Sequence, residues 1–546
     1  MSPRNAIVLL LALSTVLFLA ACGGNGSSPA TPVAPPSGAF SNSNLNGTYV
    51  FSISGTDQSN GAPYAMVGTF TANGSGGNGK GGITAGTFDL NDAVSGTAAG
   101  ASITSGSTYS VGQDGRGEAM IATNISGLSN ITFDFVLSSS SHGLITEFDS
   151  FGSGSGTLDL QVSGVTPSGT YAFSLSGAAS NSGSTWATVG NFAVSGGTFS
   201  GSDDFNENTL AFSGSTVTGS LVLGPSATPA TTLAVVSSSG SSVFTGTFDA
   251  VAIDATHLKF IEMDATATLS GDAYSQTSPT IATGTLAFTL AGSEFAAGGL
   301  MTTNGSGGIT GTEDFNVEGT NVSSQSSPAP FGAAYAVDPT NAGRYVLSSF
   351  TTFEGGSSYA AYPSSGGVLL LEIDGTGISV GAAYPQTAGA TFAASQGYGM
   401  NLSGANLAGV GNGAVEVDDI AEFAAAASGG TLSSGIIDEN YAPGGVAALG
   451  IALSNGTYGT IGSGGRYGIS ATAGNSTTST LLGGFTLTFY AVDGTTFPFM
   501  EVDPGQVSTG VIVLQTPSSS SSAIAHAHMF VVRPLIRALG ARQKKN

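Results

Sequence analysis

The chain has 546 residues, of which 40% are hydrophobic and only 8% are charged. This length predicts several domains, and high apolar content with few charges excludes a mainly disordered chain. Residues 38–515 hold all 34 acidic residues and five basic ones, a formal charge of −29. That balance excludes nucleic acid as a partner, because phosphate binding needs clustered Lys and Arg.

The N-terminus has the pattern of a bacterial export signal. Arg4 precedes the apolar run AIVLLLALSTVLF, which is shorter than the roughly 20 residues that a membrane span needs. The stretch Leu19-Ala20-Ala21-Cys22 resembles the bacterial lipobox, in which the thiol is acylated and the preceding bond is cut. The pattern predicts a lipoprotein signal peptide over residues 1–21 and a lipid on Cys22, the only cysteine, which excludes an intramolecular disulfide.

A Gly/Ser/Pro-rich stretch, residues 22–44, follows the signal and predicts a flexible lipidated tether. By resemblance to the sorting of lipoproteins in Gram-negative bacteria, Gly at position 23 favours the outer membrane. We therefore expect an exported protein that is bound to the outer membrane or cell surface through its lipid.

Four stretches along the chain open in the same way: GTYVFSIS from Gly47, GTYAFSLS from Gly169, GTLAFTLA from Gly284 and QGYGMNLS from Gln396. In each stretch, large apolar residues occupy every second position. This period of two, with one apolar face, predicts a half-buried strand. The apolar positions are Tyr49, Phe51, Ile53; Tyr171, Phe173, Leu175; Leu286, Phe288, Leu290; and Tyr398, Met400, Leu402.

Three polar elements recur downstream of each opening strand. The Asp-x-Asn elements are Asp89/Asn91, Asp204/Asn206, Asp314/Asn316 and Asp438/Asn440. The Glu-x-Asp elements are Glu147/Asp149, Glu262/Asp264, Glu372/Asp374 and Glu501/Asp503. The Glu follows the first Asp by 58, 58, 58 and 63 residues, and a Gln follows the Glu after 14 residues each time: Gln161, Gln276, Gln386 and Gln515. These spacings indicate duplicated modules.

The predicted fold class is all-β, with four tandem antiparallel meander modules. The module bounds are 45–161, 167–276, 282–386 and 391–515, and a basic tail, residues 516–546, follows. We prefer an up-and-down β-barrel for each module because closure removes exposed edges; a β-sandwich is the alternative. A β-helix is the rival, but its repeats are shorter. Module 1 can be divided into seven or eight strands.

The modules resemble uncharacterised surface lipoprotein repeats of acidobacterial type. In module 1 the matching motifs are Gly68-Thr69-Phe70, Gly81-Gly82-Ile83-Thr84, Asp114-Gly115-Arg116-Gly117 and Glu147-Phe148-Asp149. The resemblance covers most of residues 45–515, with modules 2 and 4 more divergent. It implies a surface location and transfers no activity.

The repeated acids have two interpretations. In a strand, the Glu and Asp of Glu-x-Asp project to one side, as a cation or sugar site would require. We favour a scaffold ion pair, because modules 1, 3 and 4 each hold one Arg upstream of the Glu, namely Arg116, Arg344 and Arg466. For Asp-x-Asn we favour turn formation, and calcium binding stays open as the alternative.

No Gly-x-Ser-x-Gly elbow, His-Glu-x-x-His helix or phosphate-binding loop occurs in the sequence. The sequence therefore predicts a protein that is not an enzyme: a membrane-anchored surface lipoprotein whose modules serve binding, adhesion or envelope structure. The expected partners are the membrane, through the lipid, and polysaccharide or other envelope components, and the expected cofactor set is none apart from calcium. A carboxylate-dependent glycan hydrolase and a ligand-free structural spacer are the alternatives.

Overall fold

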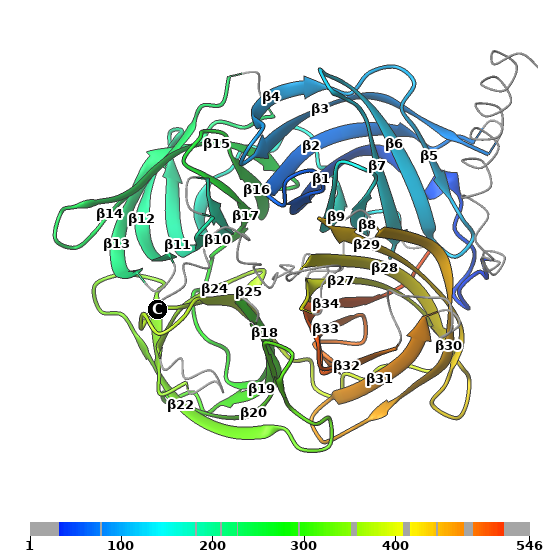
Figure 1. The fold of residues 1–546 in the computed structure, drawn as a ribbon. Coiled ribbons are helices and arrows are strands. Elements are labelled where there is room, and N and C mark those ends of the chain that lie inside the picture. Colours follow the sequence, from blue (N-terminus) through cyan, green and yellow to red (C-terminus); the bar gives the residue numbers. More distant parts are fainter. Residues whose placement is uncertain are drawn as a thin grey trace, which may run out of the picture.

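The computed structural model describes residues 32–517 except 77–78, 181–182, 208–209, 226–227, 293–294, 351–357, 408–414, 444–445 and 474–483. It contains four closed antiparallel β-barrels in tandem, arranged in a ring (Figure 1). The predicted fold class is confirmed, and so is the preference for barrels over sandwiches.

Barrel 1 contains nine strands. They are β1 (Asn46–Asp57), β2 (Pro63–Asn73), β3 (Gly81–Asp92), β4 (Gly96–Ser102), β5 (Thr108–Val111), β6 (Arg116–Ile125), β7 (Leu128–Leu137), β8 (His142–Phe148) and β9 (Gly152–Leu160). Eight of them close the barrel in the order β2-β1-β9-β8-β7-β6-β5-β3, with β2 paired to β3. The ninth, β4, pairs with the second half of β3.

Barrels 2 and 3 repeat this plan. Barrel 2 is β10 (Gly169–Ala179), β11 (Thr185–Ser195), β12 (Thr198–Glu207), β13 (Leu210–Ser220), β14 (Thr231–Val236), β15 (Ser242–Ala252), β16 (His257–Glu262) and β17 (Ala267–Ser275). Barrel 3 is β18 (Gly284–Gly292), β19 (Phe295–Thr303), β20 (Gly308–Val317), β21 (Asn321–Val322), β22 (Ala329–Val337), β23 (Tyr345–Ser348), β24 (Ser358–Ser364), β25 (Gly367–Glu372) and β26 (Ser379–Pro385). In barrel 3 the short strand β21 is the additional one.

Barrel 4 has eight strands, and its first strand pairs with its last. They are β27 (Gly397–Asn406), β28 (Val415–Ala425), β29 (Leu432–Ala442), β30 (Val446–Thr460), β31 (Arg466–Ala473), β32 (Phe485–Tyr490), β33 (Thr496–Glu501) and β34 (Gln506–Leu514). The helix among the described residues is a single 3-10 turn, η1 (Asn42–Asn44).

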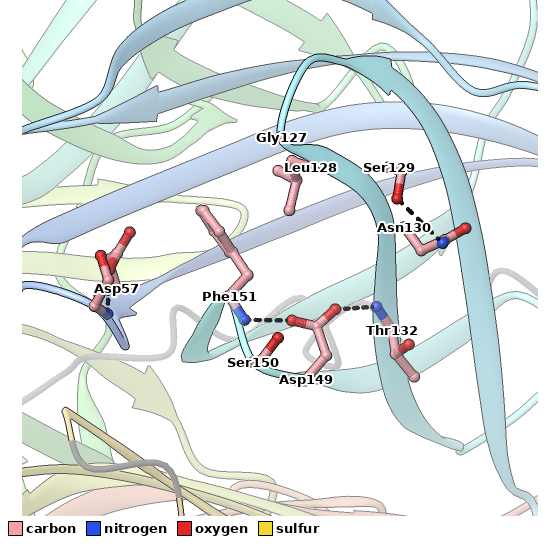
Figure 2. A pocket seen from close by; sticks show the side chains of 10 residues that line it. Asp57, Gly127, Leu128, Ser129, Asn130, Thr132, Asp149, Ser150 and Phe151 are labelled. Carbon is pink, nitrogen blue, oxygen red and sulfur yellow. Dashed lines mark hydrogen bonds between the residues drawn. The ribbon is translucent and has the colours of Figure 1, made fainter. Parts of the chain in front are cut away.

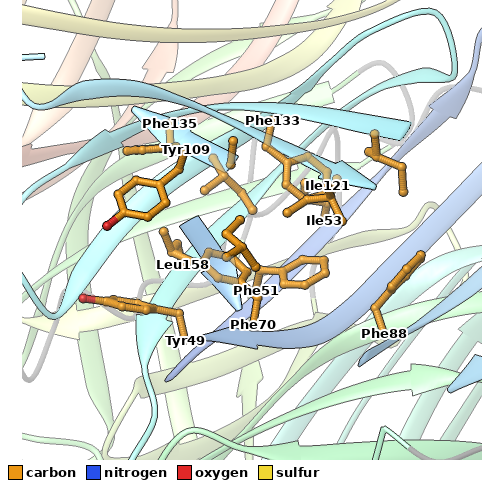
Figure 3. Packing of buried hydrophobic residues seen from close by; sticks show 14 of the residues in the cluster. Tyr49, Phe51, Ile53, Phe70, Phe88, Tyr109, Ile121, Phe133, Phe135 and Leu158 are labelled. Carbon is orange, nitrogen blue, oxygen red and sulfur yellow. The ribbon is translucent and has the colours of Figure 1, made fainter. Parts of the chain in front are cut away.

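Each barrel encloses its own apolar core, and the alternating residues of the four opening strands all point into these cores. Figure 3 shows the core of barrel 1, where Phe51 lies among aromatic side chains from other strands, with its ring centroid 5.4 Å from that of Phe133. Close strand approach in such a small barrel needs glycine. A Cβ on Gly156 would lie 1.6 Å from the carbonyl oxygen of Ser52 on the neighbouring strand.

The outer faces of the barrels also pack together. The first strands of each barrel contact the last strands of the next barrel, and those of barrel 4 contact β7, β8 and β9 of barrel 1. One buried apolar cluster draws side chains from all four barrels, including Leu144, Tyr274, Tyr384 and Tyr490. The chain therefore closes on itself as a ring of barrels (Figure 1).

The predicted signal peptide, Cys22 and most of the basic tail lie outside the described residues. Of the tether, residues 32–44 are described, and there the Ser37 hydroxyl donates to the carbonyl of Gln515. Among the described residues no helix combines the length and apolarity needed to cross a membrane.

Candidate functional site

The polar residues that recur in every module meet at the interfaces between barrels. We call these interfaces seams 1/2, 2/3, 3/4 and 4/1, after the two barrels that each one joins. Four elements build a seam: the Asp and the Asn of Asp-x-Asn, the closing Gln of the same barrel, and the turn after the Glu of the next barrel.

The Asp-x-Asn elements lie in strands, so the predicted turn is wrong. They lie in β3, β12, β20 and β29, where the intervening residues point inward and the Asp and Asn point outward. In barrels 1, 2 and 4 the strand register shifts at the Asp, as in a β-bulge. There each Asp accepts a backbone N–H from the next strand, donated by Gly100, Gly214 and Gly450. The correction applies to Asp89/Asn91, Asp204/Asn206, Asp314/Asn316 and Asp438/Asn440.

The Asn of each element crosses a seam, as Asn206 and Asn316 show. Asn206 of barrel 2 donates to the carbonyls of Glu372 and Gly377 in barrel 3, both at 2.9 Å. Asn316 of barrel 3 donates to three carbonyls around the matching turn of barrel 4, at 2.7–3.2 Å. Both side chains are buried. Where the sequence suggested a turn or a calcium ligand for Asn206 and Asn316, the structure places each amide as a donor between two barrels.

The Asn bonds of the other two seams have the same geometry. Asn91 donates to carbonyls of barrel 2 at 2.8 and 2.9 Å. Asn440 of barrel 4 closes the ring, because it donates to the carbonyls of Glu147 and Gly152 in barrel 1, both at 2.9 Å. The Asn of each module therefore donates at least two hydrogen bonds to carbonyls of the next barrel.

The closing Gln makes a second crossing. Gln276 donates to the carbonyl of Pro363 at 2.9 Å, and Gln515 donates across seam 4/1 to the carbonyl of Asp114 at 2.7 Å. Gln161 and Gln386 make the equivalent bonds at seams 1/2 and 3/4. The constant spacing of 14 residues thus places the Gln at the end of the last strand of its barrel, where its side chain reaches the next barrel.

The three repeated arginines form ion pairs, as predicted, but the prediction that each pairs with the Glu of its own module is wrong. Each Arg pairs across a seam with the Asp of Asp-x-Asn in the preceding barrel. Arg344 binds both carboxylate oxygens of Asp204, at 2.6 and 2.7 Å, and Arg466 binds Asp314 in the same bidentate way. Such pairs fix orientation as well as charge.

Seam 4/1 also has an Arg–Asp ion pair, but the contact is not bidentate. Arg116 contacts Asp438 of barrel 4 with one nitrogen at 2.8 Å and its own neighbour Asp114 at 3.1 Å. Burial disfavours the charged guanidinium, but Asp438 and Asp114 outweigh it and raise the pKa of Arg116.

Seam 1/2 has a different charge arrangement. Barrel 2 presents Asp249 to Asp89, where barrels 1, 3 and 4 present an arginine to the preceding barrel. Both carboxyl groups are buried. Burial, opposed by the Gly100 N–H and reinforced by Asp249, raises the pKa of Asp89 to about 8. A neighbouring carboxyl group opposes ionisation, so Asp249 adds to the effect of burial on Asp89.

The Glu of Glu-x-Asp points into its barrel and is buried in all four modules. In module 2, burial and the adjacent Asp264 raise the pKa of Glu262 to about 9. In module 4, burial raises the pKa of Glu501 to about 8, although the Ser508 hydroxyl donates to this Glu.

The Asp of Glu-x-Asp fastens the turn. Asp149 accepts the backbone N–H of Thr132 at 2.7 Å and that of Phe151 at 2.6 Å (Figure 2). Asp264 and Asp374 accept the equivalent pairs of N–H groups. The Asp thus ties the last hairpin to the strand that precedes it in modules 1, 2 and 3.

Two buried histidines occupy matching positions beside the seams. His142 lies 2.7 Å from Asp159, and His257 lies 2.6 Å from Asp272, which also pairs with Lys259. Burial opposes ionisation of Asp272, but Lys259 and His257 outweigh it and lower its pKa. These pairs are part of the ring interior.

The calcium alternative finds no matching donor set within the described ranges. There no group of three or more His, Cys, Asp or Glu side chains has the geometry to hold a metal ion. In addition, the amide nitrogens of Asn206 and Asn316 face carbonyl oxygens, and Asp204 and Asp314 are each occupied by a guanidinium.

Comparisons with known proteins give a distant structural similarity alone. No family model and no curated protein matches this sequence. The solved structures that match include transferrin binding protein B from serogroup B Neisseria meningitidis, with 11% identity and a TM-score of 0.20 over 69% of this chain and 84% of that one. A variant of the same kind of protein from Haemophilus parasuis Hp5 shares 8% identity, with a TM-score of 0.16 over 70% and 83%. Superposition at this level supports no argument about the function of the chain.

Proposed function

We propose that this chain is an exported, lipid-anchored surface protein whose four barrels form one rigid ring that binds envelope or extracellular polymers without catalysis. One observation carries the proposal: the Asn and the Gln that recur in all four modules fasten each barrel to the next. Duplication therefore built an assembly with turns presented at the barrel ends, and not four copies of an active site.

The burial of the repeated carboxyls argues against the hydrolase alternative. A glycosidase needs two carboxyl groups that flank the substrate bond. Here Glu147 is fully buried inside barrel 1, and burial with the neighbouring Asp149 holds its pKa well above the usual range. An acid enclosed by the core reaches no polymer.

The place where the chain enters the ring supports an anchored role. The first described tether residue, Pro32, lies beside seam 4/1, where its carbonyl accepts a hydrogen bond from the side chain of Gln113. The chain leaves barrel 4 at the same seam, since Asn44 donates to the carbonyl of Pro517 at 2.8 Å. A lipid on Cys22 would thus hold the whole ring from one seam through the flexible tether.

The lipid anchor and the surface location can be tested in cells. We expect the full-length protein to incorporate labelled palmitate, to fractionate with the outer membrane and to be cleaved by protease added to intact cells. The variant Cys22→Ser should lose the label and be released from the membrane while keeping the β-sheet circular dichroism spectrum. Equal palmitate labelling of both proteins, or retention of the unlipidated variant in the cytoplasmic fraction together with the native protein, would contradict the proposal.

The spacer alternative differs from the binding role in one measurable respect. A spacer holds other components apart and binds no polymer, so purified ring protein would pass through immobilised envelope polysaccharide without delay. The binding role predicts retention, and retention should need the folded ring, so the protein kept unfolded in urea on the column should elute earlier.

A further inference from the structure

One end of barrel 1 carries a pocket of about 470 Å³ (Figure 2). It lies between three turns: the β1–β2 turn with Asp57, the β6–β7 turn with Leu128, and the β8–β9 turn with Phe151. Its size is in the range of sites that bind small molecules, roughly 300–1,000 Å³.

The apolar side of the pocket is made by Phe151 and Leu128, both partly exposed. Tyr64 supports the Phe151 ring from behind in an edge-on contact, with ring centroids 4.9 Å apart. This aromatic is specific to module 1. The positions four residues after the Glu in the other modules hold Thr266, Thr376 and Gly505. The duplicated scaffold does not need a ring here, because three of its four copies lack one.

The rest of the pocket is polar and lacks basic residues. Four hydroxyl side chains line it, those of Ser59, Ser129, Thr132 and Ser150, together with the amide of Asn130. The two carboxylates are already engaged: Asp149 holds the N–H groups of its turn, and Asp57 accepts both the N–H and the hydroxyl of Ser59. They therefore add negative potential at fixed positions, which disfavours an anionic ligand.

Ring closure holds the walls of this pocket. The Asn440 side chain of barrel 4 binds the carbonyls of Glu147 and Gly152, the residues on either side of the turn that carries Phe151. On the opposite wall, Gln58 donates to the carbonyl of Tyr441, also in barrel 4. Pre-organised walls reduce the entropy cost of binding.

We propose that this pocket binds one or two units of a neutral saccharide, with a sugar face stacked on Phe151 and its hydroxyls bonded to Thr132, Ser150 and Asn130. An aromatic face with uncharged donors and acceptors matches the alternating apolar C–H faces and hydroxyl edges of a pyranose. The absence of basic residues from the lining sets the specificity against uronic acid and sulfated sugars. The inference rests on the proposed function and names the ligand class and the place of binding.

The test uses the full mature chain, made soluble by Cys22→Ala, on an array of neutral, uronic acid and sulfated glycans. Titration calorimetry with the best neutral oligosaccharide then compares Phe151→Ala with Thr266→Ala, which alters the matching turn of barrel 2. We expect Phe151→Ala to weaken binding by about tenfold or more, as loss of a stacking ring does, and Thr266→Ala to leave binding within about twofold. Phe151→Leu, which keeps apolar volume without a ring, should behave as Phe151→Ala and guards against a folding defect.

Several results would overturn the saccharide site. These are no binding to any neutral glycan, binding only to acidic glycans or to a polyamine such as spermine, and neutral binding that survives Phe151→Leu unchanged. The surface location is measured separately by palmitate labelling and protease access. Failure of this site with a labelled, surface-exposed protein leaves the proposed function standing, whereas loss of labelling with intact glycan binding does the reverse.

Discussion

The two matched positions Asp89 and Asp204 should respond in opposite ways to the same substitution, Asp→Asn. Asp204 lies against a guanidinium of the next barrel, whereas Asp89 lies against the carboxyl group of Asp249. An Asn at position 89 keeps an oxygen for the Gly100 N–H and gains an amide that can donate to Asp249. An Asn at position 204 removes one of the two carboxylates that pair with Arg344, and Asp338 is the other.

The magnitude follows from the pKa of Asp89, which burial raises from 3.8 to about 8. Between these values the folded ring binds a proton that the unfolded chain has released, so the free energy of unfolding falls as pH rises. The slope is at most about 1.4 kcal/mol per pH unit, or about 4 kcal/mol lost by pH 7. The contribution is fully present below about pH 4 and is lost by about pH 8. Asp89→Asn removes this loss.

Urea unfolding at pH 5, 6, 7 and 8 measures the effect. The fluorescence of Trp186, the sole tryptophan, reports on barrel 2, which forms one side of both seams. We expect the free energy of unfolding of Asp89→Asn, relative to the native chain, to rise by about 4 kcal/mol between pH 5 and pH 8. Asp204→Asn should lose about 3 kcal/mol at every pH, because the buried Arg344 loses its bidentate partner and keeps one carboxylate, that of Asp338. An Asp89→Asn variant that is destabilised as much as Asp204→Asn, or that keeps the native pH slope, would refute the raised pKa of Asp89 as the cause of the pH dependence.

Three further substitutions test the other contacts. Asn440→Ala should leave two buried carbonyls without a donor, cost about 2–3 kcal/mol and speed amide hydrogen exchange in the β8–β9 turn, while exchange around Trp186 stays unchanged. Arg466→Lys keeps the charge but loses the bidentate contact with Asp314, so urea unfolding should show a loss of about 2 kcal/mol. An unchanged urea midpoint would show that the bidentate contact does not stabilise the protein. Glu262→Gln copies the protonated form that a pKa of about 9 favours at neutral pH, so its melting temperature at pH 7 should fall little, whereas Glu262→Lys should prevent folding of barrel 2.

The fold could be predicted because a strand alternates strictly between two environments. The large apolar residues Tyr49, Phe51 and Ile53 share one face, and the structure places all three in the core of barrel 1. The sequence predicts seven or eight strands for module 1, whereas barrel 1 has nine; the ninth, β4, has the sequence GTAAGAS and no large side chain in alternation. Strand pattern therefore finds the elements that contribute to a core and misses those that pair at an edge.

The sequence predicted which residues belong to the candidate site but not which groups they contact. The repeat spacing singled out Asn91, Asn206 and Asn316, but alternation does not tell what an outward residue faces. In an isolated barrel these side chains would face water, and a turn would be a reasonable role. Their true partners are carbonyls about 170–190 residues away in the next barrel. The constant distance between the Glu and the Gln was the signal in the sequence that could have indicated a contact between barrels. A polar residue that keeps its spacing in every module, and that has no place in the core of its own barrel, needs a partner in another barrel.

Closure also explains why the array needs no separate capping modules. An open array of repeats exposes an unsatisfied face at each end and needs altered terminal units. Here the free ends meet: barrel 4 offers Asn440 and Gln515, and barrel 1 offers the carbonyls that accept them. A chain lacking residues 391–515 would expose those acceptors together with Val136 and Leu144 of the ring interior. We expect this three-barrel chain to associate with further copies, seen as higher mass in light scattering, since an exposed apolar face with unpaired carbonyls recruits a partner. A stable monomer of three barrels would show instead that each seam is dispensable to the barrels it joins.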